Sequence, residues 1–434
     1  MIFNILKAVL GFSVMIFIHE LGHFIACKMV GVRVEVFSIG FVPIIKKKFG
    51  DTEYAIGAIP FGGYVKPAGG DLSADTEEST GAPDEFLSKN FWQKTFILIA
   101  GPFMNVVLAV ISFWIIAFFI GISDYRPDNR VGGPLEEGYP AIENGLQVGD
   151  RIVAINGEKT ATWTDVLEHI GNSGGKEQVY TMQRGNEIYE VKMTPKKDPD
   201  YGHYRIGITQ FIEPVLGGMD KDSPAFKAGL REGDKIIEVN GVEVKSFPMV
   251  DTSEEPLKLK IVREGKYLEF TIVPEKVGGL NYSGNYEKQF SYGISIFVPR
   301  KKLPFFESVG YSFKMTGVGL LLIFQSLKMI SQKLSNAKQL GGPILISYIL
   351  YETSKSSLGD LLSIIGLLSI NLAFINLFPL IIITDGGQIT IFAIESLRKK
   401  PLSAENRAKL NFIGFMLVVS LMVFVIVNDV IRFF

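Results

Sequence analysis

The sequence predicts a polytopic α-helical membrane protein that carries two copies of a β-rich domain between its helices. Hydrophobic residues make up 47% of the chain and charged residues 21%, so apolar and polar regions must alternate. Apolar segments long enough to cross a bilayer lie near both ends of the chain. Between them, a polar region of about 180 residues contains an internal repeat, which indicates a duplicated domain.

Four apolar segments predict about four transmembrane helices. They cover residues 2–30, 94–121, 358–380 and 410–428. Each can span the hydrocarbon core of about 30 Å at about 1.5 Å per residue.

A further apolar stretch, residues 305–330, is interrupted by Lys314, Gln325 and Lys328. This pattern fits either an amphipathic helix at the membrane surface or a fifth span, and we favour the membrane surface.

The first apolar segment contains the motif His19-Glu20-Leu21-Gly22-His23. On a helix, histidines four residues apart lie on one face and can bind one Zn²⁺, while the glutamate between them can act as a general base on water. The alternative is a buried polar patch satisfied by neighbouring helices. A charged residue in mid-membrane costs about 2.5–3.5 kcal/mol, so it rarely persists without a function. We therefore predict one zinc ion per chain, in a site that hydrolyses a bond inside a membrane or at its edge.

Basic residues predict the orientation of the chain in the membrane. Lys46–Lys48 follow the first apolar segment, and Arg398, Lys399, Lys400, Arg407 and Lys409 lie between the last two. These loops should face the cytoplasm, which places both termini and the repeat region outside it.

A catalytic zinc site keeps three protein ligands and one open position, so the two histidines need a third ligand. His169 and His203 lie in the repeat region, on the wrong side of the membrane, which leaves a carboxylate. Asp385 follows the third apolar segment at a suitable depth, and the glycines after it permit close backbone approach. Asp360 lies at the opposite end of that segment and Glu395 lies beyond the glycines, so neither competes.

Two stretches of the polar region, Tyr139–Thr160 and Ser223–Val244, align without a gap. Both contain the Asn-Gly pair typical of tight hairpin turns, at Asn156-Gly157 and Asn240-Gly241. The shared pattern, P-A-x-x-x-G-L-x-x-G-D-x-I-x-x-x-N-G, resembles bacterial PDZ domains. The resemblance implies two β-rich domains whose grooves accept peptide C-termini by strand addition. The alternative is a pair of spacer domains without a ligand.

The loop between the first two apolar segments contains EYAIGAIPFGGYVKPAGG, residues 53–70. Its alternation and glycines predict a bulged β-hairpin, partly sunk into protein or lipid. The acidic stretch Asp71–Glu85 after it is predicted to be a loop.

Composition excludes several classes of protein. The net charge of −1 offers no footprint for nucleic acid. The single cysteine, Cys27, rules out a disulfide within the chain and a cysteine-based metal site. The first segment has no cleavage site typical of a signal peptide and carries the histidine motif, so we expect it to be retained.

Several motifs keep the order found in one known family. They are HELGHF (19–24), PFGGYVK (60–66), AGPFMN (100–105), LGGPI (340–344) and N-x-x-P…DGG (376–387). Together with the repeat they closely resemble the site-2 protease family of intramembrane zinc metalloproteases, in particular bacterial members with tandem PDZ domains.

The resemblance implies a role for each motif. The implied zinc ligands are His19, His23 and Asp385, and Glu20 is the implied general base. Asn376 would hold the substrate backbone. The strand around Gly62, Gly63 and Tyr64 would pair with an unwound substrate.

The chain departs from the family pattern after Asn376. The family usually reads N-x-x-P-x-P-x-x-D-G, whereas here five residues separate Pro379 from Asp385, and the second proline is missing. Gln388 follows the glycines where family members often have histidine. One extra residue turns a helix by about 100°, so we expect an extended or bulged segment after Pro379.

The implied function is regulated intramembrane proteolysis of single-span membrane proteins after prior trimming, in the bacterial cytoplasmic membrane. Anti-sigma factors and signal-peptide remnants are the implied substrates. One alternative is a non-catalytic, zinc-binding membrane scaffold with PDZ domains, which the presence of Glu20 disfavours. Another is a transporter, but transporters usually repeat their transmembrane halves, and here the repeat is polar.

The sequence predicts five parts. They are a first half of the membrane core (1–124), two PDZ domains (125–212 and 213–300), interfacial helices (301–357) and a second half of the membrane core (358–434).

Overall fold

The computed structural model describes residues 2–70, 79–124, 129–198, 202–247, 254–280, 286–332, 340–355, 357–379, 381–400 and 402–433. Most of the predicted acidic loop, residues 71–78, lies outside this set. The chain divides into two units. The first comprises Met1–Ile122 with Lys302–Phe434, and the second is Ser123–Lys301.

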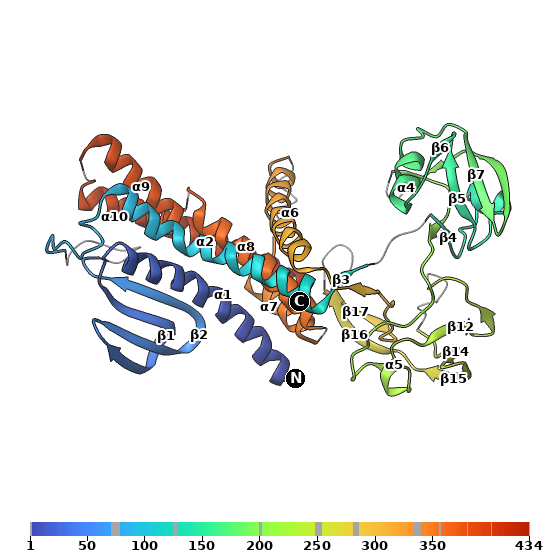
Figure 1. Ribbon diagram of the computed structural model, residues 1–434, viewed down its shortest axis with the longest axis horizontal. Coiled ribbons are helices and arrows are strands. Elements are labelled where there is room, and N and C mark those ends of the chain that lie inside the picture. The colour runs from blue at the N-terminus through green and yellow to red at the C-terminus, as the bar shows by residue number, and fades with distance from the viewer. Residues whose placement is uncertain are drawn as a thin grey trace. The chain divides into compact units, whose positions relative to one another are not determined.

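The first unit is a helical assembly with one sheet (Figure 1). Its helices are α1 (Ile2–Met29), α2 (Phe91–Ile115), the π-helical turn η1 (Ile116–Ile120), α6 (Phe305–Gln332), α7 (Pro343–Lys355), α8 (Leu358–Leu377), α9 (Asp385–Arg398) and α10 (Ala404–Phe433). Helix α2 is central, because α1, α6, α8 and α9 all pack against it.

Capping side chains define where two of these helices begin. Asn90 and Gln93 form a reciprocal capping box at the start of α2, and Ser357 and Asp360 form another at the start of α8. Each box satisfies backbone N–H groups that have no partner within the helix. Asp360 therefore has a structural role, in agreement with its exclusion as a metal ligand.

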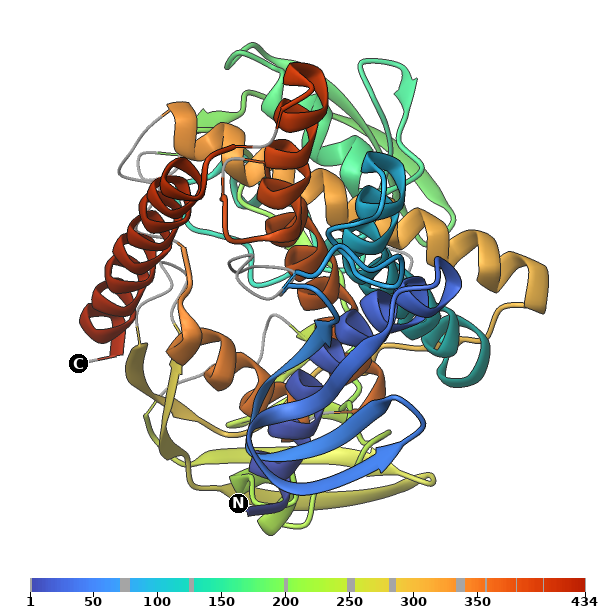
Figure 2. The same ribbon diagram turned by 90° about the vertical axis from the view of Figure 1, so that its left-hand side faces the viewer.

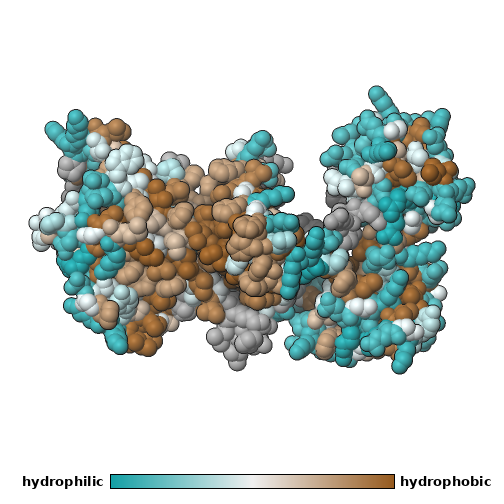
Figure 3. Space-filling view, viewed as in Figure 1, coloured by the Kyte–Doolittle hydropathy of each residue, from teal (hydrophilic) through white to brown (hydrophobic). Residues whose placement is uncertain are grey.

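Within the described residues, five helices are long and apolar enough to cross a membrane: Val9–Met29, Phe91–Ile120, Phe305–Gln332, Leu358–Leu377 and Glu405–Phe433. Four correspond to the predicted segments. The fifth, α6, is the stretch that we assigned to the membrane surface. A broad hydrophobic belt covers the first unit, whereas hydrophilic residues predominate on the second (Figure 3). The chain is a membrane protein with a polar insertion.

The sheet of the first unit consists of two long, bent strands, β1 (Val34–Phe49) and β2 (Thr52–Pro67), which lie beside α1 (Figure 2). Strand β2 folds back so that Phe37 of β1 pairs with Tyr54 on one side and with Val65 on the other. The sequence predicted a hairpin within residues 53–70. The structure instead pairs both ends of that stretch with β1, and the hairpin turn lies at Gly50–Asp51.

The second unit contains two four-stranded sheets of the same strand order, β6-β5-β7-β8 and β13-β12-β14-β15. The strands of the first repeat are β5 (Arg151–Ile155), β6 (Glu158–Lys159), β7 (Gln178–Arg184) and β8 (Glu187–Met193). Those of the second are β12 (Lys235–Val239), β13 (Val242–Glu243), β14 (Leu257–Arg263) and β15 (Lys266–Ile272). Each repeat has its own buried apolar core.

Shorter elements complete the second unit. Its helices are α3 (Pro140–Glu143), α4 (Trp163–Gly171) and α5 (Pro224–Lys227). Its remaining strands are β3 (Ile122–Ser123), β4 (Val131–Gly132), β9 (Lys196–Lys197), β10 (Tyr204–Arg205), β11 (Thr209–Gln210), β16 (Glu275–Leu280), β17 (Tyr286–Ser291) and β18 (Arg300–Lys301).

The two Asn-Gly pairs form the turns that the sequence predicted. The φ angles are 52° at Asn156 and 81° at Gly157, and 51° at Asn240 and 84° at Gly241. Two successive positive φ angles define the type I′ turn, whose twist matches that of the strands it joins. The duplication seen in the sequence is therefore a duplication of structure.

Candidate metal centre

Helices α1 and α2 approach each other closely because glycine faces the neighbouring helix on both sides. A Cβ atom on Gly22 would lie 2.2 Å from the carbonyl oxygen of Ala100. A Cβ atom on Gly101 would lie 2.4 Å from Nε2 of His23 and 2.9 Å from Cε1 of His19. Both distances are shorter than real contacts, so any side chain there would force the helices or the imidazoles apart.

The two motif histidines meet the predicted carboxylate. His19 and His23 lie one turn apart on α1, with their Nε2 atoms 3.2 Å apart. Nε2 of His19 lies 3.4 Å from Oδ2 of Asp385, and Nε2 of His23 lies 3.4 Å from Oδ1. One donor atom from each residue lies within 4.8 Å of the other two.

A backbone carbonyl orients His23. Its Nδ1 lies 2.9 Å from the carbonyl oxygen of Ile97 on α2. Because a carbonyl only accepts, Nδ1 must carry the proton, which leaves the lone pair of Nε2 directed at the cluster. This arrangement is usual for a histidine that binds a metal.

Asn105 lies behind the second histidine. Its side-chain amide is fully buried, and Nδ2 lies 3.1 Å from Nδ1 of His19 while Oδ1 has no hydrogen-bond partner. Amide oxygen and nitrogen are assigned from their contacts. With the amide turned by 180°, Oδ1 accepts a hydrogen bond from Nδ1–H of His19, which leaves Nε2 free as a ligand. Asn105 is therefore placed to orient the imidazole of His19.

Asp385 begins a new helix. The sequence placed it at the end of the third apolar helix, but α8 ends at Leu377 and Asp385 is the first residue of α9. The hydrogen bonds Phe378 N–H to Ile375, Ile381 N–H to Phe378 and Thr384 N–H to Ile381 make the connection a series of turns. This irregular connection accommodates the extra residue after Pro379.

The glycines after Asp385 allow this connection to lie against the helix. A Cβ atom on Gly386 would lie 2.2 Å from the carbonyl oxygen of Leu377, and one on Gly387 would lie 2.2 Å from that of Ile381. Nε2 of Gln388 donates to the carbonyl oxygen of Ile382 at 3.0 Å. Gln388 thus braces the segment that presents the carboxylate.

A cavity of about 390 Å³ opens beside the three donor residues. It is lined by residues from α1, the end of β2, α8 and the turn before α9, among them Glu20, Gly63, Tyr64, Leu372 and Asn376. The Glu20 carboxylate is hydrogen-bonded to the backbone of Val65. Nδ2 of Asn376 lies 3.3 Å from Nε2 of His19. The cavity thus joins the proposed base to the three donor residues.

The end of β2 borders the cavity as the outermost segment of its sheet. Residues Gly63–Lys66 pair with β1 on one side. Gly62, which we expected to contact substrate, is not among the cavity residues of the described chain. A Cβ atom on Gly62 would lie 2.0 Å from the ring of Phe41, so this glycine makes room for Phe41 instead.

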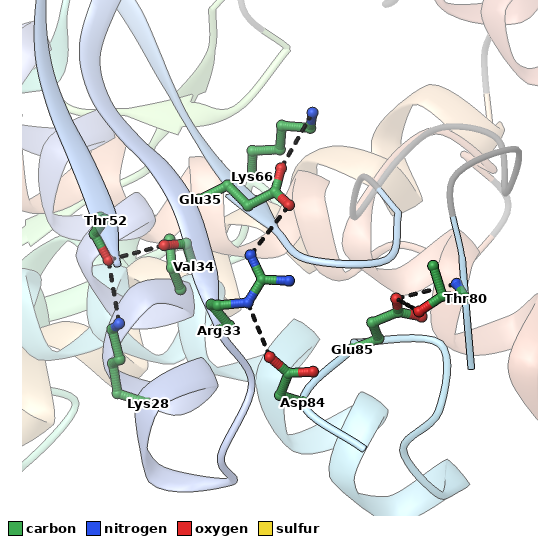
Figure 4. A network of polar contacts seen from close by, with 9 residues as sticks. All are labelled: Lys28, Arg33, Val34, Glu35, Thr52, Lys66, Thr80, Asp84 and Glu85. Carbon is green, nitrogen blue, oxygen red and sulfur yellow. Dashed lines mark hydrogen bonds and ion pairs between the residues drawn. The ribbon is translucent and has the colours of Figure 1, made fainter. Parts of the chain in front are cut away.

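A network of polar contacts anchors the outermost segment (Figure 4). Nε of Arg33 donates to Asp84 at 2.8 Å, and Lys66 pairs with Glu35 at 3.3 Å. In the same loop, hydrogen bonds from Thr80 and Ser79 lower the pKa of the Glu85 carboxyl to about 2. The network fixes both the start of β1 and the end of β2.

The donor set fits zinc. Two imidazole nitrogens and a carboxylate on convergent elements form a usual catalytic set, and three ligands leave a position open. Oδ2 of Asp385 is buried and has no hydrogen-bond partner. A buried carboxylate oxygen without a partner is costly unless a cation neutralises it. Glu395, which lies beyond the glycines, is paired with Arg407 at 2.6 Å.

Comparison with known proteins assigns the family. The model of peptidase family M50 matches residues 7–421. The chain belongs to peptidase family M50. Its membership makes it a zinc metalloprotease, which confirms the resemblance, the enzyme class and the cofactor that the sequence predicted.

Relatives cover nearly the full length of the chain. The regulator of sigma-E protease RseP from Escherichia coli is 31% identical over 456 residues, covering 99% of this chain and 98% of the relative. A putative zinc metalloprotease from Vibrio cholerae is 28% identical and covers 99% of both. The PDZ domain of an SdrC-like protein from Listeria innocua is 24% identical, with a TM-score of 0.18, and covers 19% of this chain and 93% of that domain.

Proposed function

We propose that this M50 member cleaves single-span membrane proteins within or at the edge of the bilayer, after another protease has trimmed them. One observation carries the proposal. Two imidazoles, a carboxylate and a glutamate converge on one cavity, and α1, which supplies the imidazoles and the glutamate, is long and apolar enough to cross a membrane. Family membership supports intramembrane proteolysis in general, and the substrate class is our inference.

In this proposal His19, His23 and Asp385 hold the zinc. Zinc in such a site polarises a carbonyl and lowers the pKa of water. The Glu20 carboxylate accepts the proton of the attacking water and returns it to the leaving nitrogen. Asn105 and the Ile97 carbonyl keep the two imidazoles oriented throughout.

The substrate must lose its helical hydrogen bonds before its backbone can be cut. In lipid, the freed N–H and C=O groups need partners from the protein. Residues Gly63–Lys66 offer the outermost segment of a sheet beside the cavity, so an unwound substrate can add to it as a further strand. Tyr64 and the Asn376 amide border the same cavity and would contact that strand.

The proposed orientation follows from the positions of basic residues. Lys46–Lys48 and the 398–409 loop face the cytoplasm, and the insertion 123–301 lies outside it. The chain would then reside in a bacterial cytoplasmic membrane as a multi-pass protein.

Helix α6 would lie along the membrane surface in this orientation. Leu303 N–H donates to Ala117 near the end of α2, and Gly342 N–H donates to Asp429 near the end of α10. Both ends of the intervening segment therefore belong to the outer side. This supports the interfacial assignment of 301–357 and about four spans.

We further propose that the two repeats are PDZ domains with boundaries at residues 125–212 and 213–300. Their support is the shared sequence pattern and the identical strand order. Their grooves would receive peptide C-termini if they bind a ligand.

Two substitutions test the chemistry. Glu20→Gln keeps the shape of the side chain but removes the base, so cleavage of a reconstituted single-span substrate should fall by about three orders of magnitude or more with zinc retained. Asp385→Ala should lose both zinc and cleavage. Metal analysis and a cleavage assay measure the two effects.

Near-normal turnover of Glu20→Gln would contradict the proposed mechanism. Failure of the wild type itself to cleave any membrane substrate would favour the alternative of a zinc-binding scaffold. Full zinc content in Asp385→Ala would mean that another residue is the third ligand.

A further inference from the structure

A second cavity lies in the membrane unit, apart from the metal centre. Its volume is about 450 Å³. It is bordered by α1, α2 and the region around the start of α8, and its lining includes Gly11, Val14, Ser112, Ile115, Leu361 and Ile365. The lining is almost entirely apolar, so water would find few partners in it.

The cavity exists because α1 and α8 pack against the same central helix rather than against each other. Both make extensive contact with α2, and they touch each other at few places. Small residues lie where the helices do meet. A Cβ atom on Gly11 would lie 3.2 Å from Cδ1 of Ile365, so a larger side chain there would crowd α8, and Ser112 is buried on the α2 side.

The second cavity lies along the same two helices as the cavity of the metal centre. Val14 and Ile365 line the second cavity, and Ile16 and Leu372 line the cavity of the metal centre. Val14 lies five positions before His19 along α1, a rise of about 8 Å, and Leu361 lies fifteen positions before Asn376 along α8, a rise of about 22 Å. The gap between α1 and α8 therefore continues from the metal centre toward the other membrane surface.

We propose that this cavity is a binding subsite for the transmembrane helix of the substrate, which docks there about 5–15 residues away from the peptide bond that is cut. The inference rests on the proposed function. A substrate whose unwound segment lies on the end of β2 must continue as a helix, and the gap between α1 and α8 is the continuation of the site. Glycine and serine at such a position permit the close helix approach that drives association in membranes, where the hydrophobic effect is absent.

Disulfide cross-linking tests the proposal in the full chain. The enzyme carries Cys27→Ala and Glu20→Gln, so that substrate is held uncut, and one new cysteine, Leu361→Cys. The substrate is a single-span protein that wild type cleaves, with single cysteines at successive positions of its transmembrane segment. We expect cross-links with positions about 5–15 residues from the cleaved bond. The matched control is Val423→Cys, on a side chain of α10 that is 55% exposed and lies outside the cavity lining.

Equal cross-linking of Val423→Cys, or none with Leu361→Cys, would overturn the proposal. So would labelling of Leu361→Cys by a reactive phospholipid acyl chain that substrate does not displace, because the occupant would then be lipid. If wild type fails to cleave the substrate, the proposed function itself fails, so the two failures are distinguishable.

A second variant fills the cavity. Ser112→Leu should raise KM for the membrane substrate by about tenfold, with a smaller change in kcat and with zinc retained. An unchanged KM in a folded, zinc-loaded variant would contradict the subsite.

Discussion

At the scale of single residues, the geometry of the metal centre depends on four glycines, because they have no side chain. Gly22 and Gly101 let α1 and α2 approach until the imidazoles fill the space between them. Gly386 and Gly387 let the start of α9 lie against the end of α8 and against the turn that precedes α9. Each glycine faces backbone or one of the proposed ligands, so an added methyl group would overlap with atoms that cannot easily move. The donor set is therefore positioned by close backbone contact as much as by hydrogen bonds.

Gly101→Ala tests this dependence. The added Cβ would lie 2.4 Å from Nε2 of His23, so the imidazole must move away from the cluster. We expect zinc affinity to fall by about 10–100-fold, the usual cost of disturbing an outer contact of a metal site, and cleavage to fall with it. Metal titration of the purified chain measures the loss.

The control is Gly310→Ala on α6, where no atom lies within 4 Å of the added methyl. It should bind zinc like wild type. Equal zinc affinity in both variants would show that the helices can separate without disturbing His23.

The sequence predicted which three residues the structure brings together, but not how their side chains are oriented. His19 and His23 share a helix face by spacing alone, and Asp385 was the one acid at a suitable depth. The contact of His23 with the Ile97 carbonyl could not be predicted from the sequence, because every residue has a backbone carbonyl. Asn105 could be noticed from the sequence, because it is a polar residue within an apolar helix, and the structure shows that it is buried.

At the scale of elements, each repeat has an ion pair with a buried carboxylate at an equivalent place. Arg184 binds Asp150, whose side chain is 1% exposed, and Arg263 binds Asp234 in the same way. Burial raises the pKa of Asp150, but hydrogen bonds from Arg184, the Gln147 N–H and Tyr189 outweigh it, so its pKa lies below the usual 3.8. The carboxylate form is thus favoured by folding.

This sign predicts the pH dependence of the first repeat. Because the pKa of Asp150 is lower in the folded state, its ionisation stabilises the folded repeat at any pH above its pKa in the unfolded chain, about 3.8. This stabilisation is lost as the pH falls through the pKa of Asp150 in the folded state. We expect Asp150→Asn to destabilise the repeat by about 2–3 kcal/mol at pH 7, and by progressively less below pH 4.

Urea unfolding of the full chain in detergent, followed by the fluorescence of Trp163 in α4, measures this effect. Trp92 and Trp114 in α2 are replaced in all samples so that Trp163 alone reports. Asp234→Asn is the matched control, and it should leave the Trp163 transition unchanged. A pH-independent difference would contradict the ionic origin of the effect.

Local signals predicted the repeats better than they predicted the first sheet. Asn-Gly turns and alternating residues are short-range features, and both copies show them. In the first unit, both ends of β2 pair with the same part of β1. Such pairing depends on contacts distant in sequence, so residues 53–70 read as a hairpin when taken alone.

At the scale of the whole molecule, orientation is the first property to test. A single cysteine at Asn186, in the exposed turn between β7 and β8, should react with a membrane-impermeant thiol reagent in intact cells whose outer membrane is opened and whose Cys27 is replaced. Ser253, a further site in the insertion, lies outside the described residues.

The control is Ser396→Cys on α9, which should react only after lysis. The reverse pattern would invert the proposed topology, and labelling of both sites in intact cells would show that the membrane was not sealed.

The insertion also bears on substrate choice. An intramembrane protease meets every single-span protein in its bilayer, so it needs a filter. The two repeats are attached between the end of η1 and the start of α6. If they exclude substrates with bulky outer domains and admit trimmed ones, selectivity comes from steric rejection. If they bind the trimmed substrate's new C-terminus, it comes from attraction. We favour rejection.

Gly229→Val distinguishes the two models. Gly229 has a φ of +105°, and an added Cβ would lie 3.0 Å from the ring of Phe270, so valine there should disrupt the second repeat. Gly279→Val in β16, where no atom lies within 4 Å, is the matched control. Under rejection, Gly229→Val begins to cut substrates whose outer domains are intact. Under attraction, it cuts trimmed substrate more slowly. Unchanged cleavage of both substrates, with disruption of the repeat verified by limited proteolysis, would reject both models.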